Sequence, residues 1–148
     1  MSYVHPTIAI MKIPSISSPP AVSTYSELDM QTELQRIIEF RLLTPVFQPI
    51  IALDSRRILG YEALIRGPEN SVLHTPDQLF STARTTKQLA SLEFACRAAS
   101  CEKFVALNLS GKLFLNMTPL SFTDSQYRDG VTREILQRVG LSPERVVF

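Results

Sequence analysis

Two apolar segments around a short polar turn dominate the pattern of the chain. Val46–Leu53 is almost continuously apolar, which is typical of a strand covered on both faces. Ile58–Arg66 follows directly after a polar turn at residues 54–57. So short a connection predicts that the two strands pair in antiparallel fashion.

Outside this pair, stretches with helical spacing alternate with stretches that resemble strands. Ser26 is suited to cap a helix whose first turn carries Glu27 and Asp29, and Pro45 is expected to end that helix. Strands that alternate with helices predict an α/β protein with a mainly parallel sheet. The other elements expected are helices near Pro76–Thr85, Ala90–Ala106 and Val131–Val139, a turn at Asn108–Gly111, and strands at Lys112–Thr118 and Arg145–Phe148.

The first 25 residues show neither the apolar spacing of a helix nor the alternation of a strand. They contain four prolines and five serines, a composition that favours a flexible leader over a packed element. A regulatory tail is the alternative interpretation. The sequence therefore predicts a Pro/Ser-rich leader at residues 1–25, followed by one folded unit at residues 26–148.

Composition narrows the classes of function. The chain has 148 residues, 45% of them apolar, and its 15 basic and 14 acidic residues nearly cancel. No basic stripe suggests binding to a nucleic acid polymer. The apolar residues in Thr7–Ile13 are too few for a membrane span or a signal peptide. Cys96 and Cys101 have no metal-binding or redox spacing, so we expect reduced cysteines in a cytoplasmic protein.

The second strand of the hairpin carries the residues with chemical interest. Alternation along a strand places Glu62, Leu64 and Arg66 on one face. A carboxylate and a guanidinium on so apolar a strand need partners. A metal ion for Glu62 and a phosphate for Arg66 are natural ones, and an ion pair between the two side chains is the alternative.

The same segment resembles a known family. FQPI followed by GYEALIRG is similar to the opening of the EAL domain, the family of phosphodiesterases that hydrolyse the bacterial messenger cyclic di-GMP, and Glu62-Ala63-Leu64 is its signature tripeptide. The resemblance extends over roughly residues 30–148. Its later landmarks are PDQLFSTA, LEFACRAA, KLFLNMTP and GLSPERVVF.

The resemblance implies a fold. EAL domains are TIM-like (β/α)8 barrels with one antiparallel strand near the start, in agreement with the hairpin. A complete barrel usually needs roughly 250 residues, and Val46–Phe148 supplies less than half of that. We therefore expect a partial EAL domain at residues 26–148, truncated at about the fourth strand. An open half-sheet of this kind is expected to expose strand edges and to aggregate.

The resemblance also implies site residues. Glu62 and Asn116 are the expected metal ligands, for Mg²⁺ or Mn²⁺ as the family implies. Arg66 is expected to hold a substrate phosphate, and Gln48 to contact the nucleotide. Leu64 is expected to pack against the substrate or the barrel interior. As ordinary alternatives, Asn116 is a turn-forming residue before a proline and Gln48 a hydrogen-bonded polar residue of a strand.

Two other polar residues compete for these roles. ALNLSG, which contains Asn108, superficially resembles the strand that carries the family's asparagine, but it follows directly on a helix and lies in a turn that contains glycine. Asn116 in LFLNMTP has the better strand character and is preferred. His74 lies in a polar loop with nothing like a catalytic triad around it, and we expect a solvent-exposed histidine there.

The resemblance implies a function for the full-length form. That form is expected to hydrolyse cyclic di-GMP to pGpG by metal-assisted attack of water. The family's further metal ligands and catalytic residues lie in strands after Phe148, so the catalytic set is incomplete and the chain as given is expected to be inactive. The alternatives are a non-catalytic module that binds cyclic di-GMP or a protein, and a non-functional truncated remnant. A homodimer through the EAL domain is a further expectation.

Overall fold

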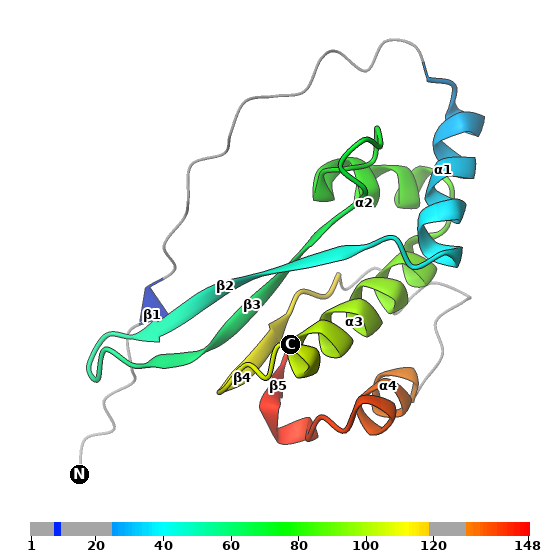
Figure 1. Ribbon diagram of the computed structural model, residues 1–148. Helices are drawn as coiled ribbons and strands as arrows, with labels where there is room; N and C mark the ends of the chain where they lie inside the picture. Colours follow the sequence, from blue (N-terminus) through cyan, green and yellow to red (C-terminus); the bar gives the residue numbers. More distant parts are fainter. Residues whose placement is uncertain (1–7, 10–24, 119–129) are drawn as a thin grey trace.

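The computed structural model describes residues 8–9, 25–118 and 130–148. Its five strands form one sheet in sequence order, β1-β2-β3-β4-β5 (Figure 1). The first three strands pair in antiparallel fashion, and β4 and β5 continue in parallel. The strands are β1 (Ile8–Ala9), β2 (Thr44–Ala52), β3 (Ile58–Arg66), β4 (Lys112–Leu115) and β5 (Val146–Val147).

Within the described residues, four helices and one 3₁₀ turn accompany the sheet. The long helix α3 runs beside β3 and β4, and α4 lies next to α3 (Figure 1). This order of helices and strands confirms the expected α/β class with an antiparallel pair at the start of the sheet. The helices are α1 (Glu27–Glu39), α2 (Pro76–Thr85), α3 (Leu89–Ala106) and α4 (Val131–Val139), and the 3₁₀ turn is Pro143–Arg145.

Helix α1 starts as its sequence predicts but ends earlier. The Ser26 hydroxyl accepts a hydrogen bond from the Asp29 amide, and the Asp29 carboxylate accepts one from the Ser26 amide, which is a capping box. The expectation that the helix runs to Pro45 was wrong. Arg41 adopts a left-handed φ of 54°, and the Leu42 amide bonds back to the Ile37 carbonyl, so the helix stops at Glu39 in a Schellman-type turn.

The β2–β3 hairpin is confirmed, with one difference in burial. Its strands pair along almost their whole length, with an irregularity between Ile50 and Ile51. Pro45 lies inside β2 rather than in front of it. The expectation that β2 is covered on both faces was wrong, because Val46 is 44% exposed. Phe47, on the opposite face, packs against the buried cluster that includes Phe104 of α3 and Ile135 of α4.

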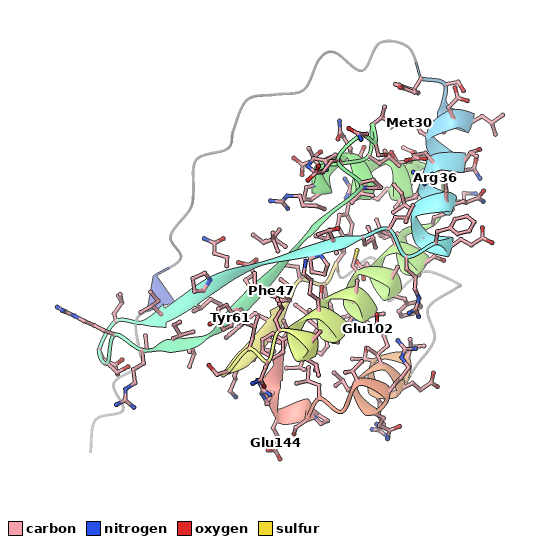
Figure 2. The ribbon with its side chains drawn as sticks, viewed as in Figure 1. Met30, Arg36, Phe47, Tyr61, Glu102 and Glu144 are labelled. Carbon is pink, nitrogen blue, oxygen red and sulfur yellow. The ribbon has the colours of Figure 1, made fainter. Side chains whose placement is uncertain are left out.

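The covered face of the sheet packs on α3. Phe104 of α3 is fully buried, and its ring meets those of Phe47 and Tyr61 edge-on, with centroids 5.9 and 6.4 Å away. Figure 2 shows the Phe47 and Tyr61 side chains close together between the hairpin and α3. Ala63 and Leu113 belong to the same buried cluster, so the odd-numbered residues of β3 face the helices as strand alternation predicts.

Strand β4 lies very close to β3 at Gly60. A Cβ atom on Gly60 would lie 2.8 Å from both the carbonyl carbon and the amide nitrogen of Lys112, and nearer still to the Lys112 oxygen. Only glycine therefore fits at this position without moving a backbone. The strand ends at Leu115, earlier than the expected Thr118.

The two ends of the chain are described in part. Within the expected leader, Ile8–Ala9 forms a two-residue strand that pairs with β2, while residues 1–7 and 10–24 lie outside the described residues. At the other end, Arg145 belongs to the 3₁₀ turn, so β5 is shorter than expected. Among the helices that the structure describes, none has the length and apolar character to cross a membrane.

Candidate functional site

The residues expected to form the site share the face of the sheet that α3 does not cover. In the β2–β3 register Gln48 lies opposite Glu62, and Thr44 lies opposite Arg66. Directly opposed residues point to the same face, and the neighbours of Glu62 on β3 point to the helices. The hairpin therefore presents Gln48, Glu62, Leu64 and Arg66 together.

Strand β4 brings Asn116 to the same place. The parallel register pairs Glu62 with Phe114 and Ala63 with Leu115, so the residue after the strand arrives beside β3. The Asn116 Nδ2 atom donates a hydrogen bond of 2.9 Å to Glu62 Oε1, across 54 positions of sequence. Within the part of the chain that the structure describes, the ion pairs do not include one between Glu62 and Arg66.

The Glu62–Asn116 contact fits the donor set of a hard cation. A carboxylate and an amide carbonyl are oxygen ligands of the kind that Mg²⁺, Mn²⁺ and Ca²⁺ prefer. Rotating the Asn116 amide by a half turn exchanges Nδ2 for Oδ1, so that both side chains present oxygen to the same point. Asn116 is exposed and Glu62 is half-buried, so an ion can reach them. Among the described residues no group of three or more His, Cys, Asp and Glu side chains converges as a metal site.

Arg66 and Leu64 lie beside this pair. Arg66 Nη1 donates a hydrogen bond of 2.8 Å to the carbonyl of Ile65, which holds the half-buried guanidinium at the carboxyl end of β3. The fork of a guanidinium offers further N–H groups for a phosphate. Leu64 and Asn116 together line a cavity of about 110 Å³.

The competing polar residues lie elsewhere. Asn108 is exposed in the turn after α3, with a left-handed φ of 49°, so the expected turn is confirmed. The expectation of a solvent-exposed His74 was wrong. Its ring is half-buried, and Nδ1 lies 3.0 Å from the carbonyl oxygen of Gly67. His74 thereby ties the end of its loop to the residue that follows Arg66.

Sequence reasoning missed a buried ion pair on α3. Glu93 and Arg97 are 5% and 4% exposed, and their side chains approach to 3.9 Å. Glu93 Oε1 accepts a hydrogen bond of 3.1 Å from the amide of Thr118, and Arg97 Nη1 donates one of 2.7 Å to the Thr132 hydroxyl. The signal was present, because a Glu and an Arg four positions apart lie in a stretch that is otherwise nearly all apolar or small.

The cysteines do not supply a nucleophile. Cys96 and Cys101 are both free, as expected. Burial raises the pKa of the Cys96 thiol to about 12 and that of the Cys101 thiol to about 11. Because the thiolate is the reactive form, neither side chain is activated for covalent chemistry.

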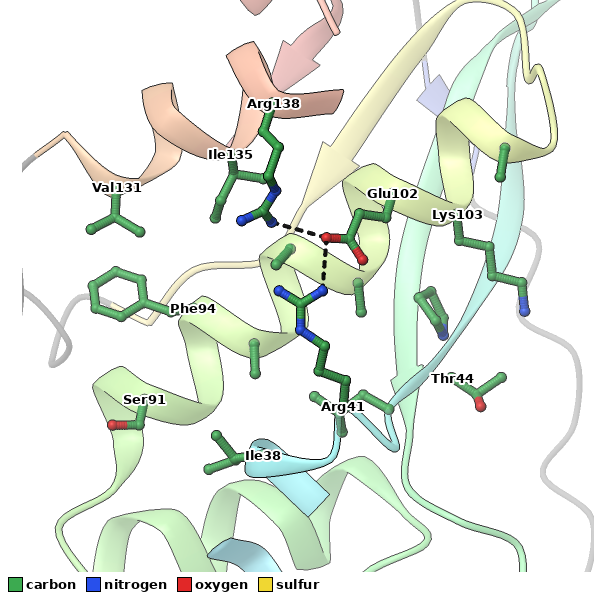
Figure 3. Close-up of a pocket in the computed structure, with 16 residues that line it drawn as sticks. Ile38, Arg41, Thr44, Ser91, Phe94, Glu102, Lys103, Val131, Ile135 and Arg138 are labelled. Atoms are coloured by element: carbon green, nitrogen blue, oxygen red, sulfur yellow. Dashed lines mark hydrogen bonds and ion pairs between the residues drawn. The ribbon is translucent and has the colours of Figure 1, made fainter. Parts of the chain in front are cut away.

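A larger pocket lies on the helical side, away from these residues. It encloses about 670 Å³ between the end of α1, the start of β2, α3 and α4 (Figure 3). In it Glu102 Oε1 accepts from Arg138 Nη2 at 2.9 Å and from Arg41 Nη1 at 3.4 Å. Its lining includes none of Gln48, Glu62, Arg66 and Asn116.

Comparisons with solved structures find the same fold. The PaMucR phosphodiesterase in its c-di-GMP complex superposes with a TM-score of 0.63 and 21% identity, over 79% of this chain and 49% of that one. The FimX EAL domain of Xanthomonas citri, in complex with c-diGMP, gives 0.67 and 20%, over 81% and 47%. BlrP1 of Klebsiella pneumoniae, a manganese/cy-diGMP complex, gives 0.58 and 23%, over 71% and 26%.

The chain spans about half the length of the first two of these structures. Its fold is that of part of a TIM-like barrel of EAL type with an antiparallel first strand, as expected. A search of curated proteins finds no match. A comparison with protein families matches residues 31–148 to the EAL domain. Since this match takes in the signature Glu62-Ala63-Leu64 and its partner Asn116, the chain belongs to the EAL domain family.

Proposed function

We propose that this chain carries the N-terminal half of a cyclic di-GMP phosphodiesterase site. Glu62 and Asn116 are its metal ligands, Arg66 holds a phosphate of the substrate, and Gln48 contacts the nucleotide. The full-length form hydrolyses cyclic di-GMP to pGpG. The observation that carries the proposal is the 2.9 Å contact between Asn116 and Glu62, because an oxygen-bearing side chain of β3 meets one from the residue just after β4 on the open face of the sheet.

The structure supports a division of roles among these residues. Glu62 and Asn116 would hold a divalent cation, for which Mg²⁺ and Mn²⁺ are the proposed identities. Such an ion supplies activation of water and neutralises charge on the phosphate. Arg66 lies two positions after Leu64 at the carboxyl end of β3, the end of the strands at which TIM-barrel active sites form.

The remaining residues orient the substrate. Gln48 lies opposite Glu62 on β2, so a nucleotide held by its amide has its phosphates near the carboxylate. Leu64 lies between Glu62 and Arg66 on the same face and gives the substrate an apolar surface. We propose that binding and orientation are the contribution of this half of the domain.

Hydrolysis requires more ligands than these residues provide. Two-metal hydrolysis of a phosphodiester needs protein ligands for both ions, and the described residues bring one carboxylate and one amide to the proposed point. The 148 residues alone are therefore proposed to be inactive. Homodimer formation through this domain and a cytoplasmic location stay predictions.

The test compares the carboxylate of Glu62 with that of Glu69, seven positions later in the sequence. In a form extended beyond Phe148, Glu62→Gln is expected to abolish formation of pGpG, measured by chromatography of the nucleotides. Glu69→Gln is the matched control, since Glu69 is exposed in the loop after β3, and it should keep full turnover. Turnover of Glu62→Gln at the unaltered rate would overturn the metal assignment.

The chain of 148 residues gives a second test. It is expected to show no turnover of cyclic di-GMP with Mn²⁺ present. Hydrolysis by this chain would contradict the proposed inactivity. Binding of the nucleotide without hydrolysis in both the short and the extended form would favour a receptor module over an enzyme.

A further inference from the structure

The buried Glu93–Arg97 pair of α3 has no role in the site described above. Both side chains are more than nine-tenths buried, where ions are costly unless they are well paired. Glu93 Oε2 has no hydrogen-bond partner in the described structure, and its nearest cation is Arg97 Nη2 at 3.9 Å. Packing alone would be served better by apolar residues, so the pair calls for another explanation.

Glu93 is hydrogen-bonded to the segment that follows β4. Glu93 Oε1 accepts from the Thr118 amide at 3.1 Å, two residues after Asn116. Strand pairing fixes the chain only as far as Leu115, the last residue of β4 in the register. Asn116 therefore lies between two anchors, the ladder with β3 on one side and the carboxylate of Glu93 on the other.

Arg97 holds Glu93 in turn. Its Nη1 atom donates to the Thr132 hydroxyl at 2.7 Å, and its guanidinium carbon lies 5.4 Å from the centre of the Phe94 ring. These contacts fix the guanidinium beside Glu93 and tie α4 to the same point of α3. Glu93, Arg97 and Asn116 also line one cavity of about 110 Å³.

We infer that Glu93 is a positioning residue for Asn116. By holding the Thr118 amide, it keeps the chain after β4 at the distance from β3 at which the Asn116 amide reaches Glu62. Arg97, whose Nη2 lies 3.9 Å from Glu93 Oε2, holds the Glu93 carboxylate in place. The inference rests on the proposed function in taking Asn116 as a metal ligand, but the placement of Asn116 is measurable without metal.

The test follows two signals by NMR in the full chain without metal. One is the hydrogen exchange of the Thr118 amide, and the other is the chemical shift of the Asn116 Nδ2 protons. In Glu93→Ala we expect exchange at Thr118 to be faster by about tenfold, the net effect of one hydrogen bond. The Asn116 protons should lose their hydrogen-bonded shift and move to that of the exposed Asn108.

Three further variants separate positioning from stability. Glu93→Gln keeps an acceptor for Thr118 and should keep both signals. Leu92→Ala removes the fully buried side chain that precedes Glu93 and packs in the core with Leu34 and Leu79, and it should change neither signal. The double variant Glu93→Met with Arg97→Met fills the volume without charge, so it keeps the fold, and it should lose both signals as Glu93→Ala does.

Each outcome decides the inference. Faster exchange at Thr118 with an unchanged Asn116 shift would show that Glu93 is merely structural and would overturn it. Loss of the Asn116 shift in Leu92→Ala to the same extent would overturn it as well. Mn²⁺ tests the proposed function separately, because it should broaden the Asn116 side-chain signal and spare that of Asn108. Absence of broadening in the unaltered chain would refute the metal site, while the metal-free signals still decide the role of Glu93.

Discussion

Replacement of Gly60 by alanine tests whether the β3–β4 contact builds the site. A Cβ atom at this position would lie 2.8 Å from two backbone atoms of Lys112, closer than carbon atoms approach in proteins. Since Lys112 presents backbone here, no change of rotamer can relieve the overlap. Strand β4 must move away from β3, and Asn116 moves with it.

The size of the effect follows from three contributions. Overpacking costs about 2–3 kcal/mol, and the loss of one ladder hydrogen bond adds about 1 kcal/mol. The smaller entropy of an unfolded chain with alanine offsets about 0.7 kcal/mol. The β3–β4 pairing should therefore lose about 3 kcal/mol, which makes opening of its hydrogen bonds about a hundredfold more frequent.

Hydrogen exchange measured by mass spectrometry or NMR reads this opening directly. Amides of β3 and β4 should exchange about a hundredfold faster, and the Asn116 side chain should lose its hydrogen bond to Glu62. Gly140→Ala is the control, because a Cβ there meets nothing within 4 Å although φ is +71°, and it should cost only about 1 kcal/mol. If the β4 amides exchange as slowly in Gly60→Ala as in Gly140→Ala, the close approach of Gly60 to Lys112 does not determine the β3–β4 pairing.

Three other properties can be measured on the same chain. The Arg36 hydrogen bond holds the pKa of the Glu33 carboxyl below its ordinary 4.5. This stabilisation is complete above pH 4.5 and disappears as the pH falls through the lowered pKa. The thermal midpoint of the helical circular-dichroism signal should therefore drop with acidification, and Glu33→Gln should make that drop smaller. Cys101 is fully buried and its pKa is raised to about 11, so iodoacetamide should label it in denaturant but hardly in the native chain; rapid native labelling of Cys101 would contradict this burial. Val46 is 44% and Phe148 60% exposed, so the chain should self-associate in light scattering after gel filtration, and a monomer at every concentration would count against that.

Local patterns in the sequence predicted most of the elements. The helices α2 and α4 have the expected bounds, and α3 begins one residue earlier than expected. Turn and cap residues carry this information over a few positions, as the Ser26 cap shows. The end of α1 was missed because the apolar pattern continues through Leu42 and Leu43, which pack on the same core from outside the helix.

The site was predicted by resemblance and by strand alternation together. Alternation placed Glu62, Leu64 and Arg66 on one face, and the structure puts Asn116 against Glu62. The role of Glu93 could not be predicted in this way, because its partner Thr118 is 25 positions away and no periodic pattern joins them. His74 was misjudged for the same reason, since its partner Gly67 comes from the start of the loop that it closes.

The order of the sheet has a consequence for the order of folding. Gln48 and Glu62 meet within one hairpin, so a nascent chain can join them soon after the turn at residues 54–57 is made. Asn116 is 54 positions beyond Glu62. Closing a loop of that length costs conformational entropy, and the packing of α2 and α3 on the sheet offsets part of this cost. Of the two proposed ligands, Glu62 is therefore in place early in biosynthesis. Asn116 joins it only after α3 has docked, so a slow step in that docking would delay completion of the proposed metal site but leave the hairpin formed.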